Sequence, residues 1–522
     1  MLFNSYEFIF VFLPLSCIVF FVIASRAGTF PALIWLSACS VYFYSSWRLE
    51  NLWLLVFSIC VNYALALYVS GARQSRFVSR YVIFVFAIGI NLLILGYYKY
   101  SGFVASSIGI VFDIPVSIDS PLLPLAISFY TFTQIAYQVD SYRQGNVDRN
   151  FINYFLFVTY YPHLIAGPIV HHSELMPQFT FRSVYRPYLA NICVGLSLFV
   201  FGLFKKVCIA DTLAPFSDAV FAAATGGATI SFFEAWGGAL SYTFQIYFDF
   251  SGYSDMAMGS AALLGIWLPI NFFSPYRALS IVEFWRRWHI TLSRFLRDYL
   301  YISLGGNRQG PSRRYVNLML TMILGGLWHG AGWTFVVWGA LHGAFLVANH
   351  AWHALVSGLR LALPIPKYLS ATLSWLITFL AVVVAWVFFR AESFAAALAM
   401  LEGMAGLHGA VLDERLGRYL QFLDLFVEFG GRGIGSFGSA WGLVAIAVSL
   451  AISLFPYTSW QFVGYRWHAL ESHSLAVPEL TVDAPMLRSR MLGVCWGLFI
   501  GILFILSVSR LTRVNQFVYF NF

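Results

Sequence analysis

A single histidine lies in an apolar stretch of the chain that glycines interrupt. His329 stands within Leu324–Trp333, which carries four glycines. An ionisable side chain at membrane depth is costly, so it usually faces a protein cavity and serves a function. Irregular backbone at that depth is tolerated only where protein or a water-filled cavity surrounds it. The stretch therefore predicts a polar site built inside a membrane domain.

The composition places the whole chain among membrane proteins. Of its 522 residues, 60% are hydrophobic and 10% are charged, and the mean hydropathy is +0.74. Soluble globular chains carry about 25% charged residues. Apolar runs lie near residues 8–25, 30–47, 52–69, 81–98, 122–139, 151–165, 188–203, 230–248, 315–327, 333–348, 368–389, 438–455 and 491–507. Many of them approach the roughly 20 residues that a membrane-spanning helix needs.

These runs predict an all-α polytopic membrane protein. Several central runs are too short or too interrupted for a simple crossing, so we expect about eleven spans plus re-entrant or interfacial helices. We expect residues 1–522 to form a single membrane domain. Its polar residues of functional interest are densest between residues 242 and 350.

The excess of positive charge is interpreted as membrane topology. Arg73, Arg76 and Arg80 fill one short loop, whereas the loop at residues 99–121 carries one lysine against two aspartates. The positive-inside rule places the first loop in the cytoplasm and the second outside, so the N-terminus is expected outside. The first residues lack the basic region of a signal peptide, and we expect the first run to remain as an anchor. No basic patch is interleaved with exposed aromatic residues, so nucleic-acid binding is not expected.

A second histidine belongs to a segment rich in arginine. The pattern at Val282–Tyr301 predicts a helix of about four turns, in which Arg286 and Ser293 can share a face with His289. Seven arginines follow Trp285, and Asp298 is the one acidic residue among them: Arg286, Arg287, Arg294, Arg297, Arg308, Arg313 and Arg314. An amphipathic interfacial helix explains them. A cavity wall that attracts the phosphates of a coenzyme also explains them, and both interpretations can hold together.

The polar residues around the two histidines favour acid–base chemistry. Imidazole titrates near neutrality and can take a proton from a hydroxyl group that attacks a carbonyl. Asp249 and Asp255 lie in an aromatic stretch, Asn271 begins a helix stop, and Trp328 can wall the site. No HExxH motif or carboxylate cluster at ligand spacing indicates a metal, and no GxSxG elbow indicates a serine nucleophile.

The combination of these motifs resembles the membrane-bound O-acyltransferase (MBOAT) superfamily, in particular its bacterial alginate O-acetyltransferase branch. The matching core runs from Tyr247–Asp255 through Asn271–Arg277 and Phe284–Ser293 to Leu327–Gly330. Further matches are Leu123–Phe132, Leu164–Ile169, Trp386–Ala391 and the terminal Gln516–Phe522. The resemblance covers nearly the full length, and the set of motifs is more specific than any one of them.

The resemblance implies a ring of membrane helices around a thin centre, with His329 at the end of a cytoplasmic funnel. It makes His329 catalytic and His289 the second histidine of the site. It implies acetyl-CoA as donor substrate with no bound cofactor, a location in the bacterial inner membrane with a periplasmic N-terminus, and export of the acetyl group. Periplasmic partner proteins would complete transfer to a polysaccharide such as alginate. The candidates for contacting substrates are Arg286, Arg287, Ser293, Arg294, Asp249, Asp255, Trp328 and Asn271.

Three alternatives stay open on the sequence alone. Within the superfamily, the acyl group could be D-alanine, or the acceptor a lipid or a protein. Outside it, buried histidines and broken helices also build transporters. The chemical step also leaves two routes, direct transfer assisted by His329 as general base and a covalent acyl-histidine intermediate.

Overall fold

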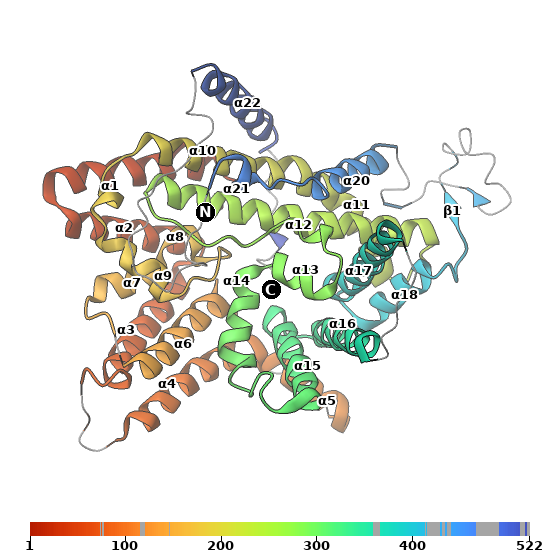
Figure 1. The fold of residues 1–522 in the computed structure, drawn as a ribbon, viewed down its shortest axis with the longest axis horizontal. Helices are drawn as coiled ribbons and strands as arrows, with labels where there is room; N and C mark the ends of the chain where they lie inside the picture. Colours follow the sequence, from red (N-terminus) through yellow and green to blue (C-terminus); the bar gives the residue numbers. More distant parts are fainter. Residues whose placement is uncertain are drawn as a thin grey trace. The chain divides into compact units, whose positions relative to one another are not determined.

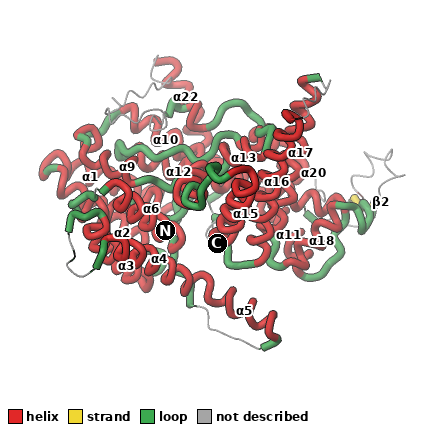
Figure 2. Tube along the Cα trace, turned by 60° about the horizontal axis from the view of Figure 1, so that its bottom comes forward, coloured by secondary structure: helices red, strands yellow, loops and turns green. Residues whose placement is uncertain are grey.

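Most of the described chain is helical, and loops connect the helices (Figures 1 and 2). The computed structural model of the protein describes residues 1–73, 75, 78–114, 121–145, 147–358, 366–412, 414, 428–430, 434–435, 440–465, 490–511 and 517–518. Within these ranges, the strands are the two-residue segments β1 (Val411–Leu412) and β2 (Glu428–Phe429), which pair in parallel. The all-α class predicted from the sequence is confirmed.

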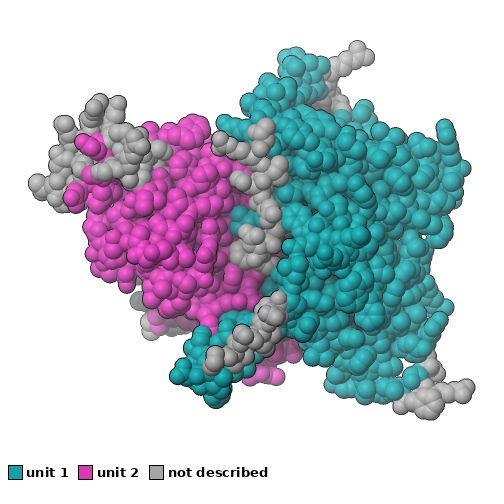
Figure 3. All heavy atoms as spheres, turned by 180° about the vertical axis from the view of Figure 1, so that it is seen from behind, with its two compact units in different colours: residues 1–203, 253–270, 459–521 teal, residues 204–252, 271–458, 522 magenta. Residues whose placement is uncertain are grey.

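The chain divides into two compact units (Figure 3). Unit 1 comprises residues 1–203, 253–270 and 459–521, and unit 2 comprises residues 204–252, 271–458 and 522. The long helix α12 (Phe232–Leu263) gives its first part to unit 2 and its last part to unit 1. The expectation of a single membrane domain stays a prediction.

Unit 1 contains most of the N-terminal helices. Its longer helices are α1 (Leu13–Ala27), α2 (Thr29–Ser45), α3 (Leu52–Val69), α4 (Arg80–Leu95), α5 (Ser101–Phe112), α6 (Ile127–Gln144), α7 (Phe151–Thr159), nearly all of α10 (Leu189–Phe204), and α22 (Arg490–Val508). Its short helical pieces are η1 (Glu7–Phe12), η2 (Leu49–Asn51), η3 (Gly96–Tyr100), α8 (Tyr161–Leu164), α9 (His172–Leu175), η4 (Met176–Thr180), η5 (Arg182–Tyr185) and α21 (Ser459–Phe462).

Unit 2 contains the helices of the motif-rich region. They are η6 (Lys205–Ala210), α11 (Asp211–Thr225), η7 (Pro275–Arg277), α13 (Ile281–Arg287), α14 (Ile290–Phe295), η8 (Leu296–Tyr301), α15 (Gly310–His329), α16 (Trp333–Gly358), α17 (Lys367–Arg390), α18 (Phe394–Met404) and α20 (Ala440–Ser453). The terminal motif Gln516–Phe522 lies outside the described residues except for Phe517 and Val518.

Within the described part of the chain, six helical segments are long and apolar enough to cross a membrane. They are Glu7–Ala27, Leu49–Val69, Arg80–Phe112, Leu189–Thr225, Lys367–Arg390 and Met491–Val508. Large apolar side chains on them remain outside the protein core; Leu498 and Ile502 of α22, for example, are 64% and 57% exposed. Such surfaces suit lipid rather than water. The protein is thus a multi-pass membrane protein, while the expected number of about eleven spans stays a prediction.

The glycine-rich stretch around His329 folds differently from the sequence expectation. Helix α15 continues through Gly325 and Gly326 to His329, so these two glycines do not interrupt it. The break is limited to residues 330–332, after which α16 begins. Gly326 instead permits close packing, since a Cβ there would lie 2.3 Å from the Phe335 carbonyl oxygen.

The predicted helix Val282–Tyr301 is wrong as a continuous element. It is divided into α13, α14 and the π-helical η8, and the break falls at Trp288–His289. His289 adopts a left-handed conformation with φ of 43°, which is uncommon for a residue other than glycine. Arg286 and Ser293 therefore do not share one helix face with His289. The break is held by hydrogen bonds of His289 and Thr291 to Asn271.

Candidate active site

Asn271 fixes the tautomer of the His289 imidazole. Both side chains are fully buried in unit 2, and His289 Nδ1 lies 3.1 Å from Asn271 Oδ1. The same Asn271 atom accepts hydrogen bonds from the Thr291 backbone N–H at 3.3 Å and the Thr291 hydroxyl at 2.9 Å. Because a backbone N–H can only donate, this atom must be the amide oxygen, and His289 Nδ1 must carry a proton. In the neutral ring the lone pair then resides on Nε2.

Burial keeps His289 neutral. It lowers the pKa of the imidazole to about 3, because the charged form loses its hydration. The residue lies in the break between α13 and α14, outside the six apolar helices. A neutral imidazole with a fixed tautomer suits hydrogen bonding and orientation of a reacting group better than it suits carrying a charge.

His329 ends α15 inside a wall of aromatic rings. It is 3% exposed, and its ring centroid lies 4.9 Å from Trp328, 5.1 Å from Trp338 and 5.2 Å from Phe389. All three contacts are edge-to-face, an arrangement worth about 0.5–1.5 kcal/mol per aromatic pair. Rings from α15, α16 and α17 thus fix the orientation of this imidazole.

The turn after His329 requires glycine. Gly330 is extended, and a Cβ built on it would lie 2.2 Å from the Phe335 ring. Gly339 of α16 also packs tightly against α15: a Cβ built on it would lie 2.4 Å from the Met322 carbonyl oxygen. The close approach expected from the glycines is therefore present, and it places Trp338 of α16 beside His329.

The two histidines face one site. Their ring centroids lie 6.5 Å apart, and Trp328 contacts both. The ring of Phe250 from α12 stands edge-on to His289 at 4.8 Å. At a centroid separation of 6.5 Å the two imidazoles are close neighbours in unit 2. This pairing brings together Asn271, Trp328 and both predicted catalytic residues.

Asp249 forms a buried ion pair rather than an open binding group. Its Oδ1 lies 2.6 Å from Lys206 Nζ, and each side chain is 1% exposed. Lys206 also contacts Asp211 at 2.8 Å. Neighbouring Phe250 belongs to the site, so the ion pair anchors the turn of α12 that packs on His289. Lys206 is not among the residues predicted from the sequence, although it is a lysine at the end of an apolar run with the acidic Asp211 nearby.

Asp255, one of the predicted substrate contacts, lies in unit 1, where Ser459 donates a hydrogen bond of 2.5 Å to its carboxylate.

The predicted polar residues of α13 and α14 mostly contact nearby protein groups. Arg287 pairs with Glu283 at 2.8 Å, and its guanidinium donates to the Phe273 carbonyl. The Ser293 hydroxyl donates to the Trp288 carbonyl oxygen at 3.4 Å, and Arg294 is half-buried. Their contacts support the local fold. Arg286 is exposed.

Comparison with known proteins identifies the class of this site. Residues 122–389 match the model of "MBOAT, membrane-bound O-acyltransferase family". The chain belongs to this family. It is therefore an acyltransferase, which decides against the transporter alternative.

Relatives of this acyltransferase carry several names. The "Peptidoglycan O-acetyltransferase" of Helicobacter pylori is 44% identical over 451 residues, which cover 81% of this chain and 83% of that protein. The "Probable alginate O-acetylase AlgI" of Azotobacter vinelandii is 43% identical over 411 residues, with 77% and 78% covered. The "Teichoic acid D-alanyltransferase" of Streptococcus thermophilus is 38% identical over 120 residues, which are 21% of this chain and 28% of that protein.

The acyltransferase also carries a third buried histidine near the pair. His342 of α16 is fully buried, one helical turn beyond Trp338, and the two rings lie 4.9 Å apart. Trp285 of α13 stands edge-on to it at 5.1 Å. No described residue hydrogen-bonds to either ring nitrogen of His342. His342 is not among the site residues predicted from the sequence.

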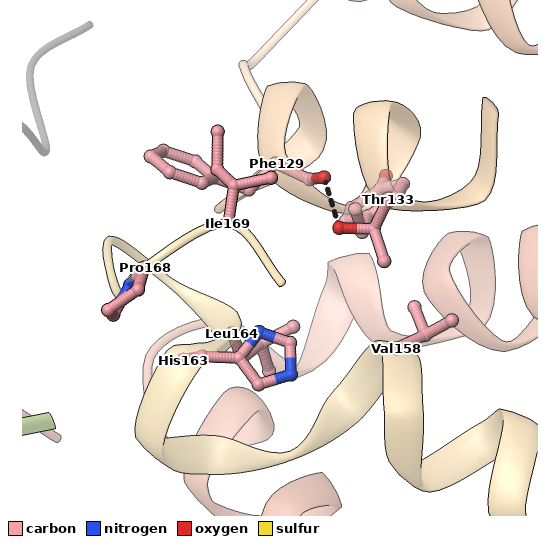
Figure 4. Close-up of a pocket in the computed structure, with 8 residues that line it drawn as sticks. Phe129, Thr133, Val158, His163, Leu164, Pro168 and Ile169 are labelled. Carbon is pink, nitrogen blue, oxygen red and sulfur yellow. Dashed lines mark hydrogen bonds between the residues drawn. The ribbon is translucent and has the colours of Figure 1, made fainter. Parts of the chain in front are cut away.

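A small pocket in unit 1 lies beside the Leu164–Ile169 motif (Figure 4). His163 lines it and hydrogen-bonds through Nε2 to the Phe157 carbonyl oxygen at 3.0 Å. Thr133 donates to the Phe129 carbonyl oxygen at 3.0 Å, and the rest of the lining is mainly apolar. These polar groups are engaged with the backbone, so the pocket has the character of a packing defect rather than a catalytic centre.

Proposed function

We propose that this acyltransferase passes an acetyl group from cytoplasmic acetyl-CoA to the periplasmic side of the inner membrane. The acetyl group then becomes an O-acetyl ester on an envelope or exported polysaccharide, with periplasmic partner proteins completing the transfer. The names of the H. pylori and A. vinelandii relatives support acetyl as the group and a glycan as the final acceptor. In this proposal the N-terminus is periplasmic.

The observation that carries the proposal is the pairing of His289 and His329. Two buried imidazoles 6.5 Å apart, one with its tautomer fixed by Asn271, form an acid–base site without a built-in nucleophile of the serine type. Such a site suits the transfer of an acyl group to a hydroxyl, because the reaction needs one proton removed and one returned.

The proposed step balances in protons and bonds. His329 accepts the proton of the acceptor hydroxyl while its oxygen attacks the thioester carbonyl carbon. A C–O bond forms, the C–S bond breaks, and the imidazolium returns the proton to the leaving CoA thiolate. The attacking hydroxyl has a single proton, which goes to His329, so His289 accepts through Nε2 a hydrogen bond from another donor group of the bound substrates and thereby orients them. A covalent acyl-histidine would instead leave an acetyl group on His329 before the hydroxyl attacks.

Mass spectrometry of envelope glycans tests this function. Cells carrying the chain, cells lacking it, and cells with the His329→Ala variant are compared for ester-linked acetyl groups on peptidoglycan and on exported polysaccharide. We expect acetyl esters on one polymer to disappear in both of the latter strains. Loss of D-alanyl esters would assign the other acyl group, and unchanged esters in all strains would reject the proposal.

A further inference from the structure

An arginine–histidine pair closes one end of the α15–α16 hairpin. Arg314 Nη2 lies 2.7 Å from His350 Nδ1. A guanidinium has donors only, so His350 accepts through Nδ1 and its ring is neutral. Burial lowers the pKa of His350, and the positive charges of Arg314, His353 and Arg286 lower it further. Helix α13, which carries Arg286, packs against α16, since the Trp285 ring lies 5.1 Å from the His342 ring.

These cations lack the counter-charges that their neighbours have. Arg287 and Arg297 pair with Glu283 and Asp298, but no described carboxylate forms an ion pair with Arg286 or Arg314.

Arg314 also stands near the start of α15, where the first turn contains no acidic residue. The positive end of a helix favours anions and disfavours cations. Arg314 is the fifth residue of α15, just past this turn, so the helix end gives its charge no stabilisation.

The hairpin connects this end to the catalytic pair. Gly326 and Gly339 lock the two helices at the His329 end, and Gly343 meets Met319 farther along. From Trp338 beside His329 to His350 the helix advances about 18 Å, at 1.5 Å per residue. An extended pantetheine arm with its diphosphate has a length of the same order. The buried His342 lies between the two ends.

We propose that Arg286, Arg314 and His350 bind the diphosphate of the acyl-CoA donor, so that the hairpin sets the distance from this anchor to His329. The proposal rests on the proposed function. Planar guanidinium groups match phosphate oxygens in a bidentate way, and His350 orients Arg314 for that contact. The anchor holds the donor without touching its reacting carbonyl.

Steady-state kinetics of the full-length protein in proteoliposomes tests the anchor. Acetyl-CoA is compared with S-acetyl-N-acetylcysteamine, a thioester without phosphates. Arg314→Met should raise KM for acetyl-CoA about ten- to hundredfold, as expected when a charged hydrogen bond of about 1.5–3 kcal/mol is lost. The kcat for acetyl-CoA and the rate with the short thioester should stay at wild-type values.

A matched control and a conservative variant make the result specific. Arg297→Met removes the same charge from a residue that is 61% exposed and already paired with Asp298, so KM should change little. Arg314→Lys keeps the charge but not the fork, and should give an intermediate KM. Equal KM for Arg314→Met and Arg297→Met would overturn the proposal. So would an equal loss of rate with both thioesters, which indicates damage to the fold.

Two further outcomes separate this proposal from related ones. If the wild-type protein consumes no acetyl-CoA, the proposed function fails. If it does, and Arg314→Met keeps the wild-type KM, only the anchor fails. A lipid phosphate is the other source of the same chemistry: a KM that is unchanged by Arg314→Met, together with a weaker response of the rate to anionic lipid, would assign the cations to the membrane and overturn the proposal.

Discussion

Unit 1 and unit 2 both bury polar side chains, but they engage them in different ways. In unit 1, Asn62 of α3 and Asn91 of α4 exchange hydrogen bonds of 3.1 and 2.7 Å between their side-chain amides. Gln138 of α6 donates to the Asn62 carbonyl oxygen at 2.7 Å, and Gln134 donates to Ser58 at 2.9 Å. These amides link helices to one another.

Around His329 and His342 of unit 2, several buried polar groups belong to rings that pack against other rings. His342 and the indole N–H groups of Trp285, Trp338 and Trp386 have no hydrogen-bond partner among the described residues. His329 is held mainly by edge-to-face aromatic contacts. The difference teaches that amides paired with amides serve helix association in this protein, whereas imidazoles held by aromatic walls are available for chemistry.

The largest expected effect separates catalysis from folding. His329→Ala should lower acetyl transfer about 10²–10⁴-fold, the usual contribution of general acid–base help. Protein abundance in the membrane and the unfolding temperature in detergent should stay near wild type, since each edge-to-face contact of the ring is worth only about 0.5–1.5 kcal/mol. Radiolabelled acetyl transfer in isolated membranes measures the loss. A wild-type rate of acetyl transfer by His329→Ala would show that this buried imidazole of unit 2 does not serve catalysis.

Substitution in the buried Lys206–Asp249 ion pair should lower the stability of the protein, whereas the His329 variant should lower its activity. Lys206→Met leaves Asp249 without its cation at 1% exposure, and breaking a buried pair typically costs about 3–5 kcal/mol of stability. We expect little folded protein in thermal unfolding measurements. Replacing both partners, as Lys206→Met with Asp249→Leu, should recover part of the stability, because Asp211, at 11% exposure, is then the one carboxylate of the cluster left without the lysine. A stable single variant would show that Lys206 does not anchor α12.

Asn271→Leu tests whether the His289 tautomer matters. Removal of the acceptor oxygen should lower kcat roughly tenfold or more, because an unsatisfied buried partner costs about 1–3 kcal/mol and 1.4 kcal/mol is tenfold in rate. Comparing kcat with KM for acetyl-CoA is informative, since a change confined to KM would assign Asn271 to donor binding. His289→Gln should show a similar loss of kcat.

The smallest effect is expected in unit 1. Asn62→Ala removes a hydrogen-bonded amide between α3 and α4, and such interhelical bonds in membranes are worth about 0.6–1.7 kcal/mol. The unfolding temperature should fall slightly while kcat stays unchanged. A loss of activity at full stability would mean that the amide network serves catalysis and would blur the contrast with unit 2.

The sequence predicted the helices better than their breaks. The run at residues 52–69 coincides with α3, because an apolar stretch of that length leaves few alternatives. The break at His289 carries no glycine or proline signal; it depends on Asn271, eighteen residues upstream, which bonds to both His289 and Thr291. The local pattern of apolar residues does not predict contacts between residues that are far apart in the sequence.

The site was predictable in its centre and less so at its edges. His329 and His289 stood out because ionisable residues are costly in apolar surroundings. The arginines looked alike in sequence, and only the structure separates Arg287 and Arg297, which are paired, from Arg286 and Arg314. Asp249 looked like a binding residue because its partner Lys206 lies 43 residues away in the chain.

The most direct test of the histidine pair uses purified protein in proteoliposomes with acetyl-CoA and a soluble hydroxyl acceptor. Release of the CoA thiol and formation of the acetyl ester are followed together. The account predicts equal amounts of both products for the wild type, and loss of both for His329→Ala combined with His289→Gln. Ester formation at the wild-type rate by this folded double variant would contradict the assignment of catalysis to these two imidazoles.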